Sequence, residues 1–138
     1  MKMHAWSIIF LGMFCVAGAC VHAQGQALSA PQFTAAQAAR GEIAFANNCS
    51  ACHGKNLDNG EFAPALKGPA FKQNWGSKTL GDLFAFVTTQ MPPDNPGGLD
   101  PSIYTDILSY IASQNGAQAG AQELPTDPNA LQSMKITN

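Results

Sequence analysis

The chain has 138 residues, a length typical of a single domain. Charged residues make up 12% of the chain and the formal net charge is -2, which argues against a nucleic-acid-binding surface. The acidic excess is too small to indicate a particular kind of partner.

Residues 1–23 have the pattern of a secretory signal peptide. A short polar start precedes an apolar run over residues 5–19, and a small-x-small sequence ends at Ala23. We therefore expect export to the periplasm with cleavage after Ala23. Two alternatives are a leader retained as a membrane anchor, for which the run is short, and a lipoprotein acylated at Cys20.

Removal of this leader would simplify the set of groups that can bind a metal or a cofactor. Four cysteines become two, three histidines become one, and five methionines become two. The remaining sulfur and imidazole groups are Cys49, Cys52, His53, Met91 and Met134.

The first predicted helix follows a polar lead-in over residues 24–33. Thr34 and Gln37 fit a capping box, in which each side chain bonds the other residue's backbone N–H. Gly41 and Phe45 lie at helical spacing on one apolar face. A glycine costs a helix interior about 1 kcal/mol relative to alanine. Gly41 therefore predicts the close approach of another helix.

The second predicted helix covers residues 79–90. It follows residues 54–78, which are rich in Gly, Pro, Lys and Asn and predict an ordered loop. Thr79 and Asp82 resemble a helix cap, and apolar residues recur at i, i+3, i+4 and i+7. Two prolines follow Met91 and end the helix.

The third predicted helix has the clearest signals. Asp100 stands at the N-cap, Pro101 at the first helical position, and Asn115 with Gly116 at the end. Its predicted buried stripe consists of Ile103, Ile107, Tyr110 and Ile111. One domain is thus expected over residues 34–116, and residues 117–138 form a tail that could pack on it. No strand-like alternation occurs, so we predict an all-α protein.

The run Cys49-Ser50-Ala51-Cys52-His53 is the signature for covalent attachment of a c-type haem. Two thiols three residues apart on one helical turn can both bond the edge of a porphyrin. The next residue then places its imidazole at the iron. We predict one haem c, attached through Cys49 and Cys52, with His53 as a metal ligand.

Three other interpretations of the two cysteines fit the sequence less well. A disulfide would close a small, strained loop with little entropic gain. A thioredoxin-like redox pair requires a βαβ context, which the sequence lacks. A closed structural zinc site requires four ligands, and the mature chain offers Cys49, Cys52 and His53.

Methionine is the expected second axial ligand, because one mature histidine cannot form a bis-histidine haem. Met91 lies between a helix end and two prolines, whereas Met134 lies in the tail. We prefer Met91, since a ligand needs a preorganised environment. The alternative is that Met91 fills a gap in the core. Filling both axial positions favours electron transfer over catalysis at the iron.

These residues resemble class I c-type cytochromes over residues 34–138. The resemblance implies a small all-α fold, with three main helices wrapped around one haem and the N- and C-terminal helices crossing. It also implies that the Pro64 carbonyl accepts a hydrogen bond from His53. In the same family pattern, Leu66 packs on the haem. Trp75 lies near a haem propionate, or else serves as a core tryptophan.

Residues 88–99 and the tail resemble cytochrome subunits and domains that accompany pyrroloquinoline-quinone-dependent alcohol dehydrogenases. This implies an electron carrier rather than an enzyme, either free or as a subunit of a dehydrogenase complex. Its donor would be a periplasmic dehydrogenase, and its acceptor another cytochrome or a terminal oxidase. No nucleic acid is expected, and membrane contact is expected only if the leader is retained.

A haem enzyme or a gas-binding cytochrome is the alternative class of function. It requires that Met91 be absent from the iron or easily displaced. Binding of carbon monoxide would separate it from an electron carrier.

Overall fold

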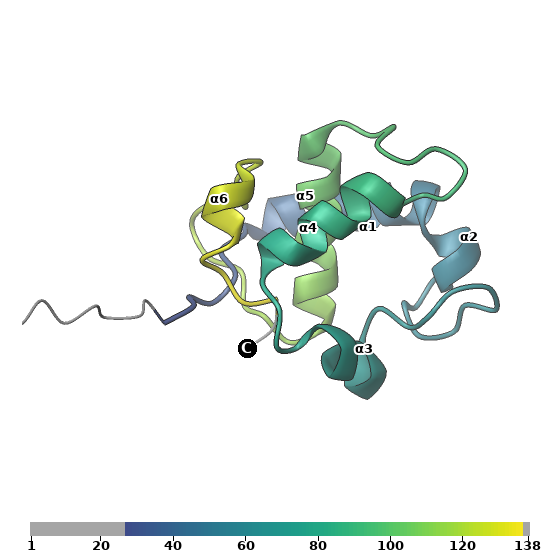
Figure 1. Ribbon diagram of the computed structural model, residues 1–138, viewed down its shortest axis with the longest axis horizontal. Coiled ribbons are helices and arrows are strands. Elements are labelled where there is room, and N and C mark those ends of the chain that lie inside the picture. The colour runs from purple at the N-terminus through teal and green to yellow at the C-terminus, as the bar shows by residue number, and fades with distance from the viewer. Residues whose placement is uncertain (1–26, 137–138) are drawn as a thin grey trace, which may run out of the picture.

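The computed structural model describes residues 27–136, which form six α-helices and no β-strand (Figure 1). Two isolated β-bridges, between Ser29 and Met134 and between Thr79 and Lys135, are the β-type pairings within this range. The predicted all-α class is therefore confirmed. The predicted signal peptide, with Cys20 and Ala23, lies outside the described residues.

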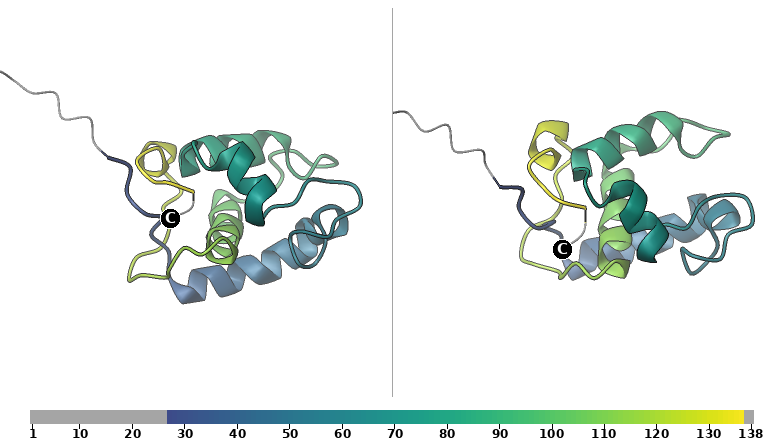
Figure 2. Two further views of the ribbon diagram at one scale, coloured as in Figure 1. Left: turned by 90° about the horizontal axis from the view of Figure 1, so that it is seen from below. Right: turned by 60° about the horizontal axis from the view of Figure 1, so that its bottom comes forward.

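The fold is organised around the crossing of α1 (Ala35–Asn48) and α5 (Pro101–Gln114), which Figure 2 shows from two further sides. Gly41 lies at the contact, where a Cβ atom would overlap the main-chain carbonyl of Asp106 and touch Tyr110. Beside it, the rings of Phe45 and Tyr110 pack with their centroids 5.6 Å apart. The close approach expected at Gly41 is thus present.

Helix α1 starts as predicted, but its capping box is only half formed. The Thr34 hydroxyl accepts a hydrogen bond from the Gln37 backbone N–H at 3.0 Å. The Gln37 side chain does not bond back to Thr34. It is buried instead and pairs with both main-chain groups of Leu124, at 3.2 Å and 2.7 Å. A partner 87 residues away therefore replaces the local one that the capping pattern predicts.

Helix α4 (Leu80–Gln90) has the full capping box that its sequence predicts. Thr79 accepts from the Asp82 N–H at 3.0 Å, and Asp82 accepts from the Thr79 N–H at 2.9 Å. Leu80, Leu83 and Phe84 are buried against the core that α1 and α5 form.

Residues 54–78 are not a continuous loop, because α3 (Gly68–Trp75) lies within them. This corrects the prediction from sequence. The helix has only eight residues and begins with Gly68-Pro69, so it lacks the long apolar periodicity of the other helices. Its buried residue, Phe71, fixes it to the core.

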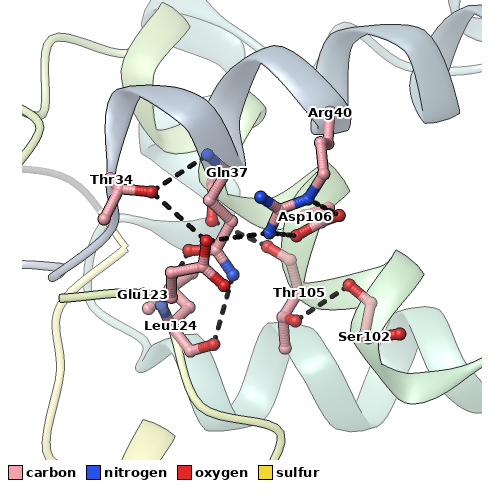
Figure 3. A network of polar contacts seen from close by, with 9 residues as sticks. Thr34, Gln37, Arg40, Ser102, Thr105, Asp106, Glu123 and Leu124 are labelled. Atoms are coloured by element: carbon pink, nitrogen blue, oxygen red, sulfur yellow. Dashed lines mark hydrogen bonds and ion pairs between the residues drawn. The ribbon is translucent and has the colours of Figure 1, made fainter.

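Residues 117–136 pack on the domain and include the short helix α6 (Pro128–Leu131). Leu124, Leu131 and Ile136 are buried. Figure 3 shows how this segment is tied to α1, where Arg40 pairs with both Asp106 of α5 and Glu123. The segment is therefore part of the folded unit.

Candidate functional site

The five residues of the Cys-x-x-Cys-His motif form one turn at the end of α1. The Cys49 N–H donates to the Phe45 carbonyl at 2.8 Å and so completes α1. The Cys49 carbonyl then accepts from the N–H groups of Cys52 and His53, at 3.2 Å and 3.0 Å, which starts α2 (Ser50–His53). One helical turn thus carries both thiols and the imidazole, as the spacing predicts.

The two thiols are unpaired and lie in different environments. Cys49 is half-buried against the core, whereas Cys52 is exposed. Burial, and to a smaller degree the neighbouring Cys52, raises the pKa of the Cys49 thiol to about 11. Cys49 is therefore a neutral thiol at neutral pH, a state in which thiol–disulfide exchange is slow.

The imidazole of His53 is held in one orientation by the chain. His53 is 9% exposed, and its Nδ1 lies 2.8 Å from the Pro64 carbonyl oxygen. A carbonyl can only accept, so Nδ1 carries a proton, and in the neutral imidazole Nε2 then keeps its lone pair. This is the arrangement that a metal-binding histidine requires.

The loop that brings Pro64 to His53 is itself closely packed. Gly60 lies against the main chain of Cys52 and His53, where any Cβ atom would overlap backbone atoms. Gly54 has a φ of 77°, in the left-handed region that favours glycine. These glycines allow residues 54–64 to fold back over α2.

Asn115 fixes the segment that follows Pro64. Its side-chain amide donates to the carbonyls of Leu66 and Ile111, each at 2.9 Å, and its Oδ1 accepts from the Gly68 N–H at 3.1 Å. The Leu66 N–H donates to the Leu57 carbonyl at 2.6 Å. Leu66 itself is half-buried against the core. From the sequence, Asn115 is identifiable only as a helix end, because its partner Leu66 lies 49 residues earlier.

Met91 is the residue that follows α4, and its main chain is bonded on both sides. Its N–H donates to the Val87 carbonyl at 3.0 Å, and its carbonyl accepts from the Tyr104 hydroxyl at 2.7 Å. The Met91 side chain is half-buried. The local sequence around Tyr104 does not indicate this bond, because the partner lies thirteen residues earlier.

Met134, the other methionine considered, lies at the opposite end of α4. Its carbonyl accepts from the Leu80 N–H at 2.9 Å, at the first residue of that helix. Eleven helical residues separate it from Met91, a rise of about 16 Å. In Figure 1 this end of α4 lies beside α6, whereas the Met91 end points toward α2.

Trp75, at the end of α3, is half-buried between two neighbours. Its ring meets the ring of Phe86 edge-on at 5.4 Å, and the Lys78 ammonium lies 4.5 Å from its centroid. His53 and Pro64 are thus joined directly, whereas Met91 and Trp75 come from other elements. Among residues 27–136, no hydrogen bond or ring contact links either of them to His53.

This set of groups fits a haem c. Two free thiols on one turn can form thioether bonds, the Nε2 of His53 can bind the iron, and a thioether is available from a separate helix end. Leu66, Val87, Leu99 and Ile103 are partly buried apolar side chains against the core, suited to a porphyrin face. Within residues 27–136, no group of three or more His, Cys, Asp or Glu side chains could hold a metal ion, and no helix is long and apolar enough to cross a membrane.

A small helical fold with this motif at the end of its first helix defines a class I c-type cytochrome. Residues 36–111 match the family model described as cytochrome c oxidase, cbb3-type, subunit III. The match covers more than half of the 138 residues, and the chain belongs to this family. Comparisons with curated proteins and with solved structures gave no match. Membership implies haem c, electron transfer and redox protein partners.

Proposed function

We propose that this protein is a single-electron carrier with one haem c, attached through Cys49 and Cys52 and ligated by His53 and Met91. The hydrogen bond from His53 Nδ1 to the Pro64 carbonyl, at 2.8 Å, carries the proposal. It selects the tautomer whose Nε2 can bind iron, beside the two thiols that would fix the porphyrin. The family match supports the same class of function.

The residues of the chain would act by holding both ligands still. The haem supplies the Fe(II)/Fe(III) couple when bound. Pro64 keeps the imidazole plane fixed and adds electron density to it through the hydrogen bond. The Met91 thioether, a soft ligand, favours the reduced iron and raises the reduction potential. A site held in one geometry costs little reorganisation when an electron enters or leaves.

We further propose that the carrier works in the periplasm after cleavage behind Ala23. Its donor would be a separate dehydrogenase of the pyrroloquinoline-quinone-dependent kind. Its acceptor would be another cytochrome or a terminal oxidase. The resemblance of residues 88–99 to cytochromes of such dehydrogenases supports the donor. The family is described as a subunit of a cytochrome c oxidase, which is in keeping with an oxidase as acceptor.

Mass spectrometry and spectroscopy of protein purified from its native compartment test these proposals together. The mass should match residues 24–138 plus one haem. The oxidised form should show the near-infrared thioether-to-iron charge-transfer band, and the reduced form should bind carbon monoxide poorly at neutral pH. Ready carbon monoxide binding with no near-infrared band would instead favour a ligand-binding cytochrome or a haem enzyme.

A further inference from the structure

Met91 stands at a boundary between ordered and exposed chain. Its N–H completes the last turn of α4, and the residue then leaves the helix with extended backbone (φ -129°, ψ 144°). Pro92 follows and has no N–H to donate. The next stretch, residues 93–98, is exposed. A ligand at such a boundary keeps its position only if something fixes it from the side away from α4.

Tyr104 supplies that fixation from α5. Its side chain is 3% exposed, and its hydroxyl donates to the Met91 carbonyl at 2.7 Å. Helix α5 is buried along most of its length and crosses α1 closely at Gly41. The hydrogen bond therefore ties Met91 to a helix that is packed in the core.

The loop after Met91, residues 92–98, makes few hydrogen bonds of its own. Its internal hydrogen bonds join the Asn95 N–H to the Pro92 carbonyl at 3.0 Å and the Gly98 N–H to the Asn95 carbonyl at 3.1 Å. Both are local turns, and neither connects the loop to the core. The hydrogen bond from Tyr104, in contrast, connects the Met91 backbone to α5 and so to the core.

We infer that Tyr104 is a positioning residue that holds the Met91 sulfur on the iron. This rests on the proposed function, in which Met91 is the second axial ligand. An outside ligand can bind only to the fraction of molecules in which Met91 has left the iron. The Tyr104 bond stabilises the attached state alone, because the Met91 carbonyl can bond water once the loop has moved away. Loss of the bond raises that fraction on the order of tenfold.

Imidazole binding to the oxidised protein measures this fraction. Tyr104→Phe should increase the apparent affinity for imidazole on the order of tenfold. It should also weaken the near-infrared thioether band at elevated temperature. Met91→Ala, which leaves the iron permanently accessible, sets the upper limit.

Two control variants separate positioning from general destabilisation. Tyr110→Phe removes the other tyrosine hydroxyl of α5, which makes no hydrogen bond among residues 27–136. Ile111→Val removes one buried methyl group from the same helix and lowers global stability. Both should leave imidazole affinity within about twofold of the unaltered protein, which is within ordinary measurement scatter and far below the tenfold expected for Tyr104→Phe.

The outcomes distinguish this inference from the proposed function. If the unaltered protein lacks the thioether band, Met91 is not the ligand and the proposed function fails. If the band is present and Tyr104→Phe binds imidazole no better than Tyr110→Phe, the positioning role is overturned.

Should Tyr104→Phe not fold, nuclear magnetic resonance on the unaltered protein replaces it. Met91 and Met134 are the only methionines within residues 27–136, so carbonyl-labelled methionine gives few signals. A slowly exchanging tyrosine hydroxyl proton coupled to the Met91 carbonyl supports the role. Absence of that coupling overturns it.

Discussion

The two proposed axial ligands are held by different means. His53 is fixed through its side chain, by the 2.8 Å hydrogen bond from Nδ1 to the Pro64 carbonyl. Met91 is fixed through its main chain, while its thioether makes no hydrogen bond among the described residues. The imidazole is therefore constrained before any iron binds, whereas the sulfur depends on the loop around it.

Met91→Ala should leave the haem attached, because Cys49, Cys52 and His53 are untouched. It should lower the reduction potential, since the soft sulfur that favours ferrous iron is lost. Redox titration measures the potential, and carbon monoxide difference spectra measure access to the iron. Met134→Ala is the matched control and should change neither. An unchanged potential in Met91→Ala would remove Met91 from the iron.

The residues that sequence could identify are those whose roles follow from short spacings. The motif from Cys49 to His53 needs one helical turn, and the chain provides it. Tyr104 and Asn115 could not be found in this way. Each acts through a side chain that reaches a distant main-chain group, 13 residues away for Tyr104 and 49 for Asn115 with Leu66. Such pairings depend on how helices pack and leave no local pattern.

At the scale of elements, helix starts are local events and helix packing is not. The Thr79–Asp82 box of α4 formed as predicted because all its partners lie within four residues. The Gln37 half of the first box failed because a buried pairing with Leu124 competes with an exposed local one. Helix α3 was not predicted, because its eight residues begin with Gly-Pro and are too few to show a helical repeat of apolar residues.

The capping box of α4 makes stability depend on pH. The hydrogen bond from the Thr79 backbone N–H, with a smaller contribution from the nearby Thr79 side chain, holds the pKa of Asp82 below its ordinary value. The folded state thus prefers the charged form of Asp82. Its contribution is present above the unfolded pKa of about 3.9 and is lost as pH falls through the folded value.

Asp82→Asn should therefore reduce the fall in unfolding free energy between about pH 4 and pH 2. Urea titrations at several pH values measure that slope. Asp94→Asn changes an exposed carboxylate in the loop after α4 and is the control. If both variants show the slope of the unaltered protein, the cap does not contribute to acid sensitivity.

Gly41→Ala tests the helix crossing. Alanine would improve helix propensity by about 1 kcal/mol. Its Cβ would, however, overlap the Asp106 carbonyl, which is backbone and cannot rotate away. We expect a net loss of about 1–3 kcal/mol in unfolding free energy from overpacking. Gly120→Ala, where nothing lies within 4 Å, should be nearly neutral by comparison. A more stable Gly41→Ala protein would contradict the close crossing.

At the scale of the whole molecule, residues 117–136 pack against the domain and do not extend away from it. Gly120 donates to the Phe33 carbonyl at 2.7 Å, and the Thr79 hydroxyl bonds Gln132 at 2.6 Å. The segment therefore connects the starts of α1 and α4. From sequence it could only be described as a tail, since its prolines hide the spacing of its buried residues.

Two variants compare the buried hydrogen bonds and the exposed ion pair that hold this segment to α1. Gln37→Ala should cost about 1–3 kcal/mol of unfolding free energy, because it leaves the main chain of Leu124 buried without partners. Glu123→Gln weakens an exposed ion pair with Arg40 and should cost less than about 1 kcal/mol. Chemical denaturation measures both. Equal losses would mean that the exposed ion pair contributes as much as the buried amide, which would contradict this account.

The bridge between Ser29 and Met134 has a geometric consequence for immobilisation. It brings both ends of the described chain to one pole of the molecule, on the side away from α2 (Figure 2). A linker attached at either end would leave from that pole. In a film of this protein grafted to an electrode by such a linker, α2 with Cys52 would face the solution. Electron transfer to a dissolved mediator should then be faster than direct electron transfer to the electrode.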